Sequence, residues 1–442
     1  MSAHHPPKTL LKQLCDERGL DVPKLIKQFD QKADQVVGKG ANNPTCSERT
    51  AKRWRAGGVN PSSLSTDTRL VLESLFGRPI ADLFAPPPQI DPHAPSFDLE
   101  QEINMTARDA QEDASATAAA SISDTNLDQL TDDVVALARD YASIAPTQAF
   151  HRGQALKLQL QDQRDRTQVP AQQQRLLELL GQTTALLATS AFNLGSFDAS
   201  RRLARSADLY GEAARCEPLR AYCDGILAYV CYFTGMPGEA AAKARRAQTY
   251  SGLGDVARRR LLAIEARAHG YLGDVDSAQR AVRLSEGVES GARDSLHDDV
   301  AGEFGFSMER LAMSSSSTAL LIGDAAQAEQ SARRALHLIE MRPTTARSAH
   351  VLGSASADLA MAHLLDGNVE AASEALTPLW DIPADQRVTG VLVRTGQIQH
   401  YLTRPVFRGS AVPTELRDRV EDFTRSAATH QLTAPALLQL EA

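Results

Sequence analysis

The chain has 442 residues, of which 43% are hydrophobic and 23% are charged, and its formal net charge is −8. This length exceeds what one compact core usually serves, so we expect at least two domains. No apolar run approaches the ~20 residues that cross a membrane, and no signal-peptide pattern follows Met1. We therefore expect a cytoplasmic protein with no membrane partner.

The charge is distributed unevenly along the chain. Residues 1–85 hold 13 basic and 9 acidic residues, residues 86–135 hold one basic residue against 11 acidic ones, and residues 136–442 are nearly balanced at 33 against 35. An acidic middle segment thus conceals a basic N-terminal part. Such asymmetry is expected when only one domain contacts a polyanion.

The N-terminal part begins with two predicted helices. Residues 8–18 place apolar side chains on one helical stripe that ends before Gly19. Residues 21–37 form a second amphipathic pattern, for which Asp21 can serve as the N-cap. A loop is expected over residues 38–45, where glycine, asparagine and proline gather.

Two further helices and a short apolar segment after them complete the predicted bundle. Ser47 can cap a short helix that runs to Ala56 and is closed by two glycines. After the Asn60-Pro61 turn, a helix is predicted from Ser65 or Thr66 to Phe76. The apolar residues after it can fold back on the bundle, so we expect a first domain over residues 1–88.

The predicted helix over residues 47–56 has an apolar back and a polar front. Ala51 and Trp54 are three residues apart and can point into the bundle. Arginine and lysine can pair with guanine or phosphate, threonine can contact a thymine methyl, and glutamate can accept from cytosine. This composition favours the major groove of duplex DNA, and an ordinary solvated helix is the alternative. The candidate DNA-binding residues are Ser47, Glu48, Arg49, Thr50, Lys52, Arg53 and Arg55.

The segment over residues 89–126 has the composition of a linker. It is rich in proline, alanine, serine, threonine and acidic residues. Residues 99–113 could form a helix that docks elsewhere or lies against the basic N-terminal part, but a solvated spacer is the favoured interpretation.

A repeat runs through the remainder, residues 127–442, where helical periodicity is continuous and no strand is expected. Five glycines each follow an apolar helical stretch, and small or apolar residues stand five, nine and twelve positions later. This spacing marks a helix face that approaches its neighbour closely, after a tight turn at the glycine. The glycines are Gly195, Gly235, Gly273, Gly323 and Gly367. The residues five positions later are Ser200, Ala240, Ala278, Ala328 and Ala372. Those nine positions later are Ala204, Ala244, Val282, Ala332 and Leu376.

This register resembles that of tetratricopeptide repeats, which stack helix pairs into a solenoid. The intervals between the glycines are 40, 38, 50 and 44 residues, longer than the ~34 of a regular repeat. We therefore expect enlarged turns, most of all around residues 285–308, and degenerate capping helices at both ends. The predicted fold is all-α: an N-terminal helix-turn-helix bundle and a C-terminal tetratricopeptide-like α-solenoid.

The N-terminal part also resembles a known family. Ser47 to Trp54, Gly57, Pro61 and the 71–77 helix end are similar to the third and fourth helices of Xre/Cro-type helix-turn-helix regulators. Together with INMTARDAQEDA (103–114), this part resembles actinobacterial Xre-type regulators that carry C-terminal tetratricopeptide repeats, and the resemblance covers most of the chain. The resemblance implies double-stranded DNA as a partner, read by the third helix, and a homodimer. Two features depart from the family: no glutamine opens the second helix, and the turn after it is long.

The resemblance to tetratricopeptide repeats also suggests where the repeat domain would bind a ligand. Positions six and three before each glycine, and one after it, would face the concave groove, where a peptide or small-molecule effector would bind. Tyrosines packed in the core and turn-forming acids are the alternative interpretation. The candidate residues are Tyr229, Tyr232, Arg267, Asp274, Asp324 and Asn368. A helix-turn-helix joined to such repeats also resembles the peptide-responsive regulators of Gram-positive quorum sensing.

The sequence offers little for an enzyme. No phosphate-binding glycine loop, HExxH or GxSxG motif is present, and His297 with two aspartates is the only cluster of histidine and acid. The five cysteines form no CxxC pair, so we expect buried thiols and neither disulfides, zinc nor another cofactor. Two functions remain: a DNA-binding transcriptional regulator with an effector-binding repeat domain, or a tetratricopeptide scaffold that binds proteins only.

Overall fold

A computed structural model describes residues 7–38, 43–87, 99–119, 121–407, 410–425 and 427. Every regular element in these residues is a helix, which confirms the all-α prediction. The chain forms two compact units, residues 1–106 and 107–442, and each is described by itself. None of the helices in the described ranges combines the length and apolar character needed to cross a bilayer.

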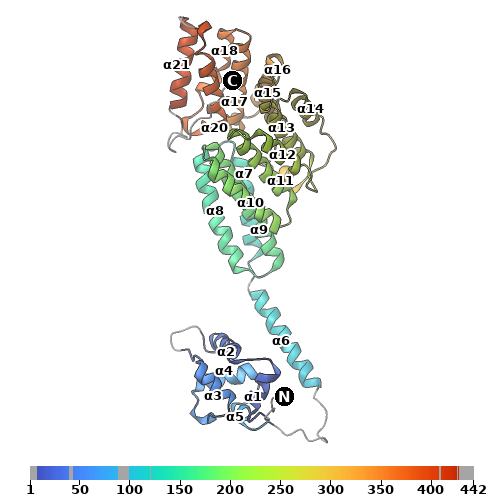
Figure 1. Ribbon diagram of the computed structural model, residues 1–442, viewed down its shortest axis with the longest axis vertical. Coiled ribbons are helices and arrows are strands. Elements are labelled where there is room, and N and C mark those ends of the chain that lie inside the picture. Colours follow the sequence, from blue (N-terminus) through green and yellow to red (C-terminus); the bar gives the residue numbers. More distant parts are fainter. Residues whose placement is uncertain are drawn as a thin grey trace. The chain divides into compact units, whose positions relative to one another are not determined.

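The N-terminal unit contains a small helical bundle (Figure 1). Its helices begin where the sequence predicted, because side chains of Thr9, Asp21, Ser47 and Ser65 each accept a hydrogen bond from a backbone N–H in the first turn. The predicted loop over residues 38–45 lies partly outside the described residues. The elements are α1 (Leu10–Glu17), α2 (Val22–Val36), α3 (Glu48–Arg55), the 3₁₀ turn η1 (Pro61–Ser63), α4 (Thr66–Phe76) and α5 (Ile80–Phe84).

Helix α6 (Leu99–Ala119) follows in the acidic segment and spans the division between the two units. A helix was one of the alternatives left open by the sequence. Its described side chains, residues 102–112, are all exposed, including the apolar Ile103 and Met105. Within the unit that it belongs to, each described side chain of α6 is therefore solvent-exposed, as on a solvated helix.

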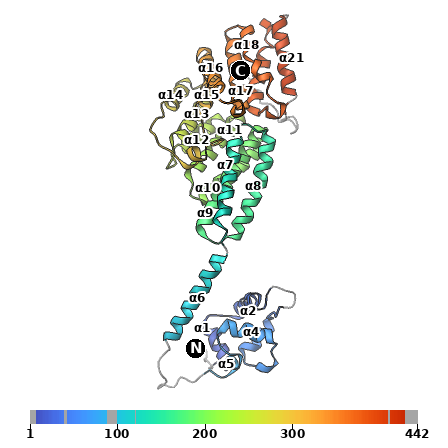
Figure 2. The ribbon, with the colours of Figure 1, turned by 180° about the vertical axis from the view of Figure 1, so that it is seen from behind.

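In the C-terminal unit each helix from α7 to α18 packs on the next along the chain, and α20 packs on α17 and α21, as the views from opposite sides help to follow (Figures 1 and 2). This order is the solenoid predicted from the repeat. The longer helices are α7 (Asp124–Asp140), α8 (Pro146–Arg166), α9 (Pro170–Asn193), α10 (Phe197–Ala213), α11 (Glu217–Phe233), α12 (Pro237–Ala247), α13 (Asp255–Tyr271), α14 (Val275–Glu286), α15 (Met308–Leu321), α16 (Ala325–Glu340), α17 (Ala349–Leu365), α20 (Thr389–Tyr401) and α21 (Ala411–Arg425). Shorter elements are α18 (Val369–Ala375), α19 (Thr377–Trp380), the π-turn η2 (Ser295–Val300), and the 3₁₀ turns η3 (Thr344–Ala346), η4 (Ala384–Gln386) and η5 (Pro405–Phe407).

The repeat register is confirmed by the backbone and by burial. All five repeat glycines adopt positive φ angles between 70° and 84°, a conformation that glycine reaches without strain. The small residues five positions later, from Ser200 to Ala372, are completely buried. The small side chain at each of these positions lets the second helix of a pair approach the first closely.

The predicted enlargement lies between α14 and α15, where residues 287–307 form an ordered insertion. Leu296 and Phe304 of this insertion are completely buried in the same core as residues of α9 and α11. The insertion also reaches α7, because the backbone N–H of Glu303 donates to the carbonyl of Ala138 at 2.8 Å. The extra length therefore packs against the earlier helices of the solenoid.

The late helices of the solenoid return to the early ones. The hydroxyl of Thr389, at the start of α20, donates to the carbonyl of Asn193 at the end of α9, at 3.0 Å. The short turn η4 contacts α8 as well. The inner face of this unit is thus bounded by residues from both ends of the repeat array.

Candidate functional site

Helix α3 is held in the N-terminal bundle by its apolar back. Ala51 and Trp54 are buried, as predicted, and the Trp54 ring packs on Phe29 of α2 with ring centroids 5.1 Å apart. The start of the helix is also fixed, because the backbone N–H of Cys46 donates to Asp30 of α2 at 3.1 Å. The rigid back determines which side of α3 faces outwards.

The outward side of α3 is basic. Arg49, Lys52 and Arg53 are exposed and lie at helical spacings of three and four residues, which places them on one stripe. Together with Glu48 and Ala56 they line a shallow surface. Glu48 and Lys52 form an ion pair of 2.6 Å, which lowers the pKa of Glu48. For Arg49 and Arg53 no ion pair or side-chain hydrogen bond is found among the described residues.

Three other predicted DNA-binding residues have local structural partners. The hydroxyls of Ser47 and Thr50 share a hydrogen bond of 2.8 Å at the start of α3, where Ser47 also caps the helix. Arg55 is only partly exposed and pairs with Asp16 of α1 at 2.5 Å. The Arg55–Asp16 pair was not predicted, because the two residues are 39 positions apart and no local pattern links them.

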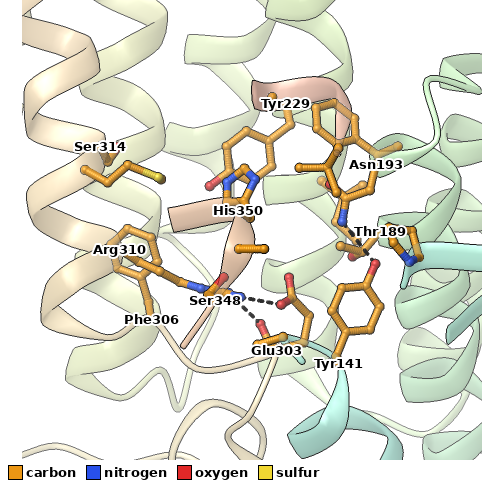
Figure 3. A pocket seen from close by; sticks show the side chains of 18 of the residues that line it. Tyr141, Thr189, Asn193, Tyr229, Glu303, Phe306, Arg310, Ser314, Ser348 and His350 are labelled. Atoms are coloured by element: carbon orange, nitrogen blue, oxygen red, sulfur yellow. Dashed lines mark hydrogen bonds and ion pairs between the residues drawn. The ribbon is translucent and has the colours of Figure 1, made fainter. Parts of the chain in front are cut away.

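A pocket lies on the inner face of the C-terminal unit. Its walls come from the first helices of successive pairs, α9, α11, α13, α15 and α17, from α20, and from the turn after α7. The insertion contributes Glu303 and Phe306. Figure 3 shows Arg310 turned towards Glu303 and Asn193 turned towards Tyr141. The cavity volume is about 120 Å³.

Three of the predicted ligand-binding residues line this pocket: Tyr229, Tyr232 and Arg267. Tyr232 and Arg267 are buried, and the tyrosine rings pack edge to face with centroids 5.6 Å apart. Both alternatives of the sequence analysis therefore apply to the tyrosines, which are core residues and also pocket walls. Whether they bind a ligand stays a prediction.

The other three predicted ligand-binding residues lie elsewhere. Asp274, Asp324 and Asn368 do not line the pocket and instead cap α14, α16 and α18. Each side chain accepts a hydrogen bond from the backbone N–H three residues later, at 3.0 to 3.1 Å. At these three positions after a repeat glycine the residue forms the turn and caps the next helix, as the alternative interpretation held.

The pocket also contains charged residues that the sequence analysis did not select. They are Arg260, Glu303, Arg310, His350 and Arg394. One signal could have indicated the first: Arg260 and Arg267 are seven residues apart on α13, which places them on the same face two turns from each other. Glu303 reaches the pocket through the insertion, and no periodicity predicts the path of an insertion.

His350 experiences several positive charges at once. Burial lowers its pKa to about 3, and the positive charges of Arg394, Arg310 and Arg267 act in the same direction. The imidazole is therefore neutral near pH 7. Its buried Nδ1 atom has no hydrogen-bond partner within the described part of the chain.

His297, the histidine of the cluster singled out in the sequence, contacts an aspartate that helps to hold the backbone of the insertion. The buried His297 lies 3.0 Å from Asp294, which also accepts hydrogen bonds from backbone N–H groups of η2 and from Gly254. Within the described ranges, no group of three or more potential ligands could hold a metal ion. Burial raises the pKa of Cys15 to about 11 and that of Cys46 to about 12, so these thiols are protonated near pH 7.

Comparison with known proteins gives no family assignment. No family model matches this chain, and no curated protein matches it. The site geometry carries the functional argument.

Proposed function

We propose that this chain is a DNA-binding transcriptional regulator. In this proposal α3 binds duplex DNA, and the pocket of the C-terminal unit binds an effector. The observation that carries the proposal is the basic stripe of Arg49, Lys52 and Arg53, opposite a helix face fixed in the bundle by Trp54. A short exposed helix with a rigid back fits the major groove.

Charge supports a polyanionic partner for this stripe. Arg49 and Arg53 have no acidic partner among the described residues, so both guanidinium groups are free to contact phosphate or guanine. Lys52 is held by Glu48 and can exchange that carboxylate for a phosphate. The Arg55–Asp16 pair fixes α3 to α1, so we assign Arg55 to positioning the helix.

The pocket of the C-terminal unit supports the proposal that the chain binds an effector. This inner pocket is lined by polar and aromatic side chains from six helices, an arrangement that can recognise a ligand and couple it to the packing of the whole array. A homodimer follows from the proposal, because regulators with such helices usually read paired half-sites.

The test uses the full-length protein. Duplex fragments that it retains are recovered from fragmented genomic DNA, and binding is measured by electrophoretic shift. We expect Arg49→Ala/Arg53→Ala to weaken binding by about tenfold or more, because each contact of this kind contributes ~1–3 kcal/mol. Arg202→Ala/Arg205→Ala is the charge-matched control, since both arginines are exposed on α10.

Two results would contradict the proposal. One is the absence of any shift at low salt. The other is an equal loss of binding in the α3 variant and in the α10 control, which would mean that overall charge and not α3 determines binding. Either result would leave a protein-binding scaffold as the better description of the chain.

A further inference from the structure

The inner pocket of the repeat unit has an excess of positive charge. Four arginines line it, Arg260, Arg267, Arg310 and Arg394, against the single acid Glu303. Arg310 forms an ion pair with Glu303. Arg394 forms one at 2.9 Å with Asp358, which does not itself line the pocket. The two remaining arginines have no carboxylate partner among the residues that the structure describes.

Arg260 is held in place by aromatic and backbone groups. Its side chain is 5% exposed, and its guanidinium lies over the Tyr222 ring at 4.2 Å and over the Tyr229 ring at 5.5 Å. Gly225 of α11 provides the space, because a Cβ atom there would come within 2.2 Å of a guanidinium nitrogen. Cation–π contacts orient the group but do not neutralise its charge.

Arg267 is buried with incomplete hydrogen bonding. It is 7% exposed, its Nε atom has no partner, and its Nη2 atom donates only a long bond of 3.5 Å to Ser314. The neighbouring hydroxyl of Tyr232 is buried and makes no hydrogen bond of ordinary geometry in the described part of the chain, although Arg267 lies close enough to act on it. A buried charge that lacks a partner is costly, so it calls for an explanation, and a bound ion or ligand is one that also fits the pocket around Arg267.

Three of the pocket arginines act electrostatically on His350, which lines the same pocket. Arg267, Arg310 and Arg394 come from α13, α15 and α20, yet all three act on this imidazole. Arg267 is the one of the three without a carboxylate partner. An anion beside Arg267 would accept hydrogen bonds from Arg267 and Tyr232 and would offset a charge that no carboxylate of the described residues pairs with directly.

One part of the wall is aromatic. Phe192, Tyr229 and Phe233 form a connected group, with Phe192 6.0 Å from Tyr229 and 5.0 Å from Phe233 between ring centroids. The cavity volume of about 120 Å³ is close to the ~150 Å³ of an apolar cavity that holds benzene. The space suits one flat ring or a group of that size.

We propose that this pocket binds a small anion, a carboxylate or phosphate attached to a flat apolar group, through Arg267, Arg260 and Tyr232. The regulatory meaning of this ligand rests on the proposed function, in which it is the effector. Binding itself requires only the pocket. A peptide whose C-terminal residue is aromatic offers the same chemistry as a free aromatic acid.

The experiment is titration calorimetry on the full-length protein. The probes are benzoate and phenyl phosphate, with inorganic phosphate as an anion without a ring and benzyl alcohol as a neutral molecule of similar size. We expect at least one aromatic anion to bind about tenfold or more tightly than benzyl alcohol, because hydrogen bonds to a charged group are the stronger ones. Equal binding of benzyl alcohol, or no binding of any anion, would overturn the proposal.

Variants locate the site. Arg267→Gln should weaken the binding of the better anion by about tenfold or more, and Tyr232→Phe, which keeps the ring, should weaken it several-fold. Arg202→Gln, outside the pocket, should leave the affinity unchanged. Circular dichroism and the unfolding temperature show whether each variant folds, and Tyr232→Phe decides the question if Arg267→Gln does not. Unchanged affinity in a folded pocket variant would overturn the assignment.

A short peptide with a C-terminal phenylalanine, compared with its C-terminal amide, separates the two ligand sources. Binding of the acid peptide alone would show that peptides can supply the anion, and binding of benzoate alone would restrict the ligand to small molecules. The DNA-binding test is independent: anion binding without a DNA shift supports the pocket and refutes the regulator, whereas a shift without anion binding refutes only the ligand class.

Discussion

At the residue scale, the presence or absence of a carboxylate partner distinguishes arginines with a structural role from those that are candidates for binding. Arg55 and Arg53 are two residues apart on α3, yet Arg55 is paired with Asp16 while Arg53 is exposed without an acidic partner among the described residues. In the same way, Arg394 is bound by Asp358 and Arg267 is not. Residue type alone gave the same expectation for Arg53 and Arg55, and three-dimensional contacts distinguish them.

His350 makes a pH-dependent contribution to stability. Its pKa is about 3 in the folded chain against an ordinary value of 6.5, so between these values the unfolded chain binds a proton that the folded chain does not. The free energy of unfolding should therefore fall as the pH is lowered from about 6.5, by up to ~1.4 kcal/mol per pH unit from this group.

Urea unfolding of the wild type and of His350→Gln between pH 5 and 7.5 measures this contribution. The difference in the free energy of unfolding between the two proteins should change steadily below pH 6.5, to the disadvantage of the wild type. A difference that does not vary with pH would show that His350 titrates normally.

At the element scale, the sequence predicted regular features well and irregular ones poorly. The caps at Asp21, Ser47 and Ser65 and the repeat turns follow from local chemistry, because a side-chain acceptor or a glycine determines each. The insertion over 287–307 was predicted only as extra length. Its contact with α7 joins Glu303 to Ala138, far apart in the sequence, and its contacts with α11 also join residues more than sixty positions apart, so no local pattern encodes them.

The insertion depends on one close approach. Gly302 has a φ of 59°, and a Cβ atom there would lie 2.3 Å from the carbonyl oxygen of Ala138. We expect Gly302→Ala to lower the free energy of unfolding by ~1–3 kcal/mol, since strained backbone and a steric clash combine. Gly291→Ala is the matched control, because Gly291 also has a positive φ but nothing within 4 Å of its Cβ position.

Denaturant unfolding and limited proteolysis measure the effect. Faster cleavage within residues 287–307 should accompany the loss of stability in Gly302→Ala and should be smaller in the control. If both variants lose the same stability, the positive φ alone matters and the contact with α7 does not hold the insertion.

At the scale of the whole molecule, two units divide the proposed tasks. The N-terminal unit offers an exposed basic helix face, and the C-terminal unit offers a pocket that both ends of its helical array enclose. The division into a bundle and a repeat array was predictable from charge and periodicity. The pocket was not, because it depends on the return of α20 to α9, seen in the bond between Thr389 and Asn193.

The salt dependence of DNA affinity tests the central claim most directly. On a recovered fragment, fluorescence anisotropy over a range of salt concentrations should show affinity that falls steeply with salt, because arginines displace counterions from phosphates. Arg49→Ala/Arg53→Ala should bind more weakly, with a shallower slope where either arginine contacts phosphate, since each such contact contributes about 0.9 to the logarithmic slope. The same affinity and slope in the wild type and this variant would contradict the assignment of α3 as the DNA-binding helix.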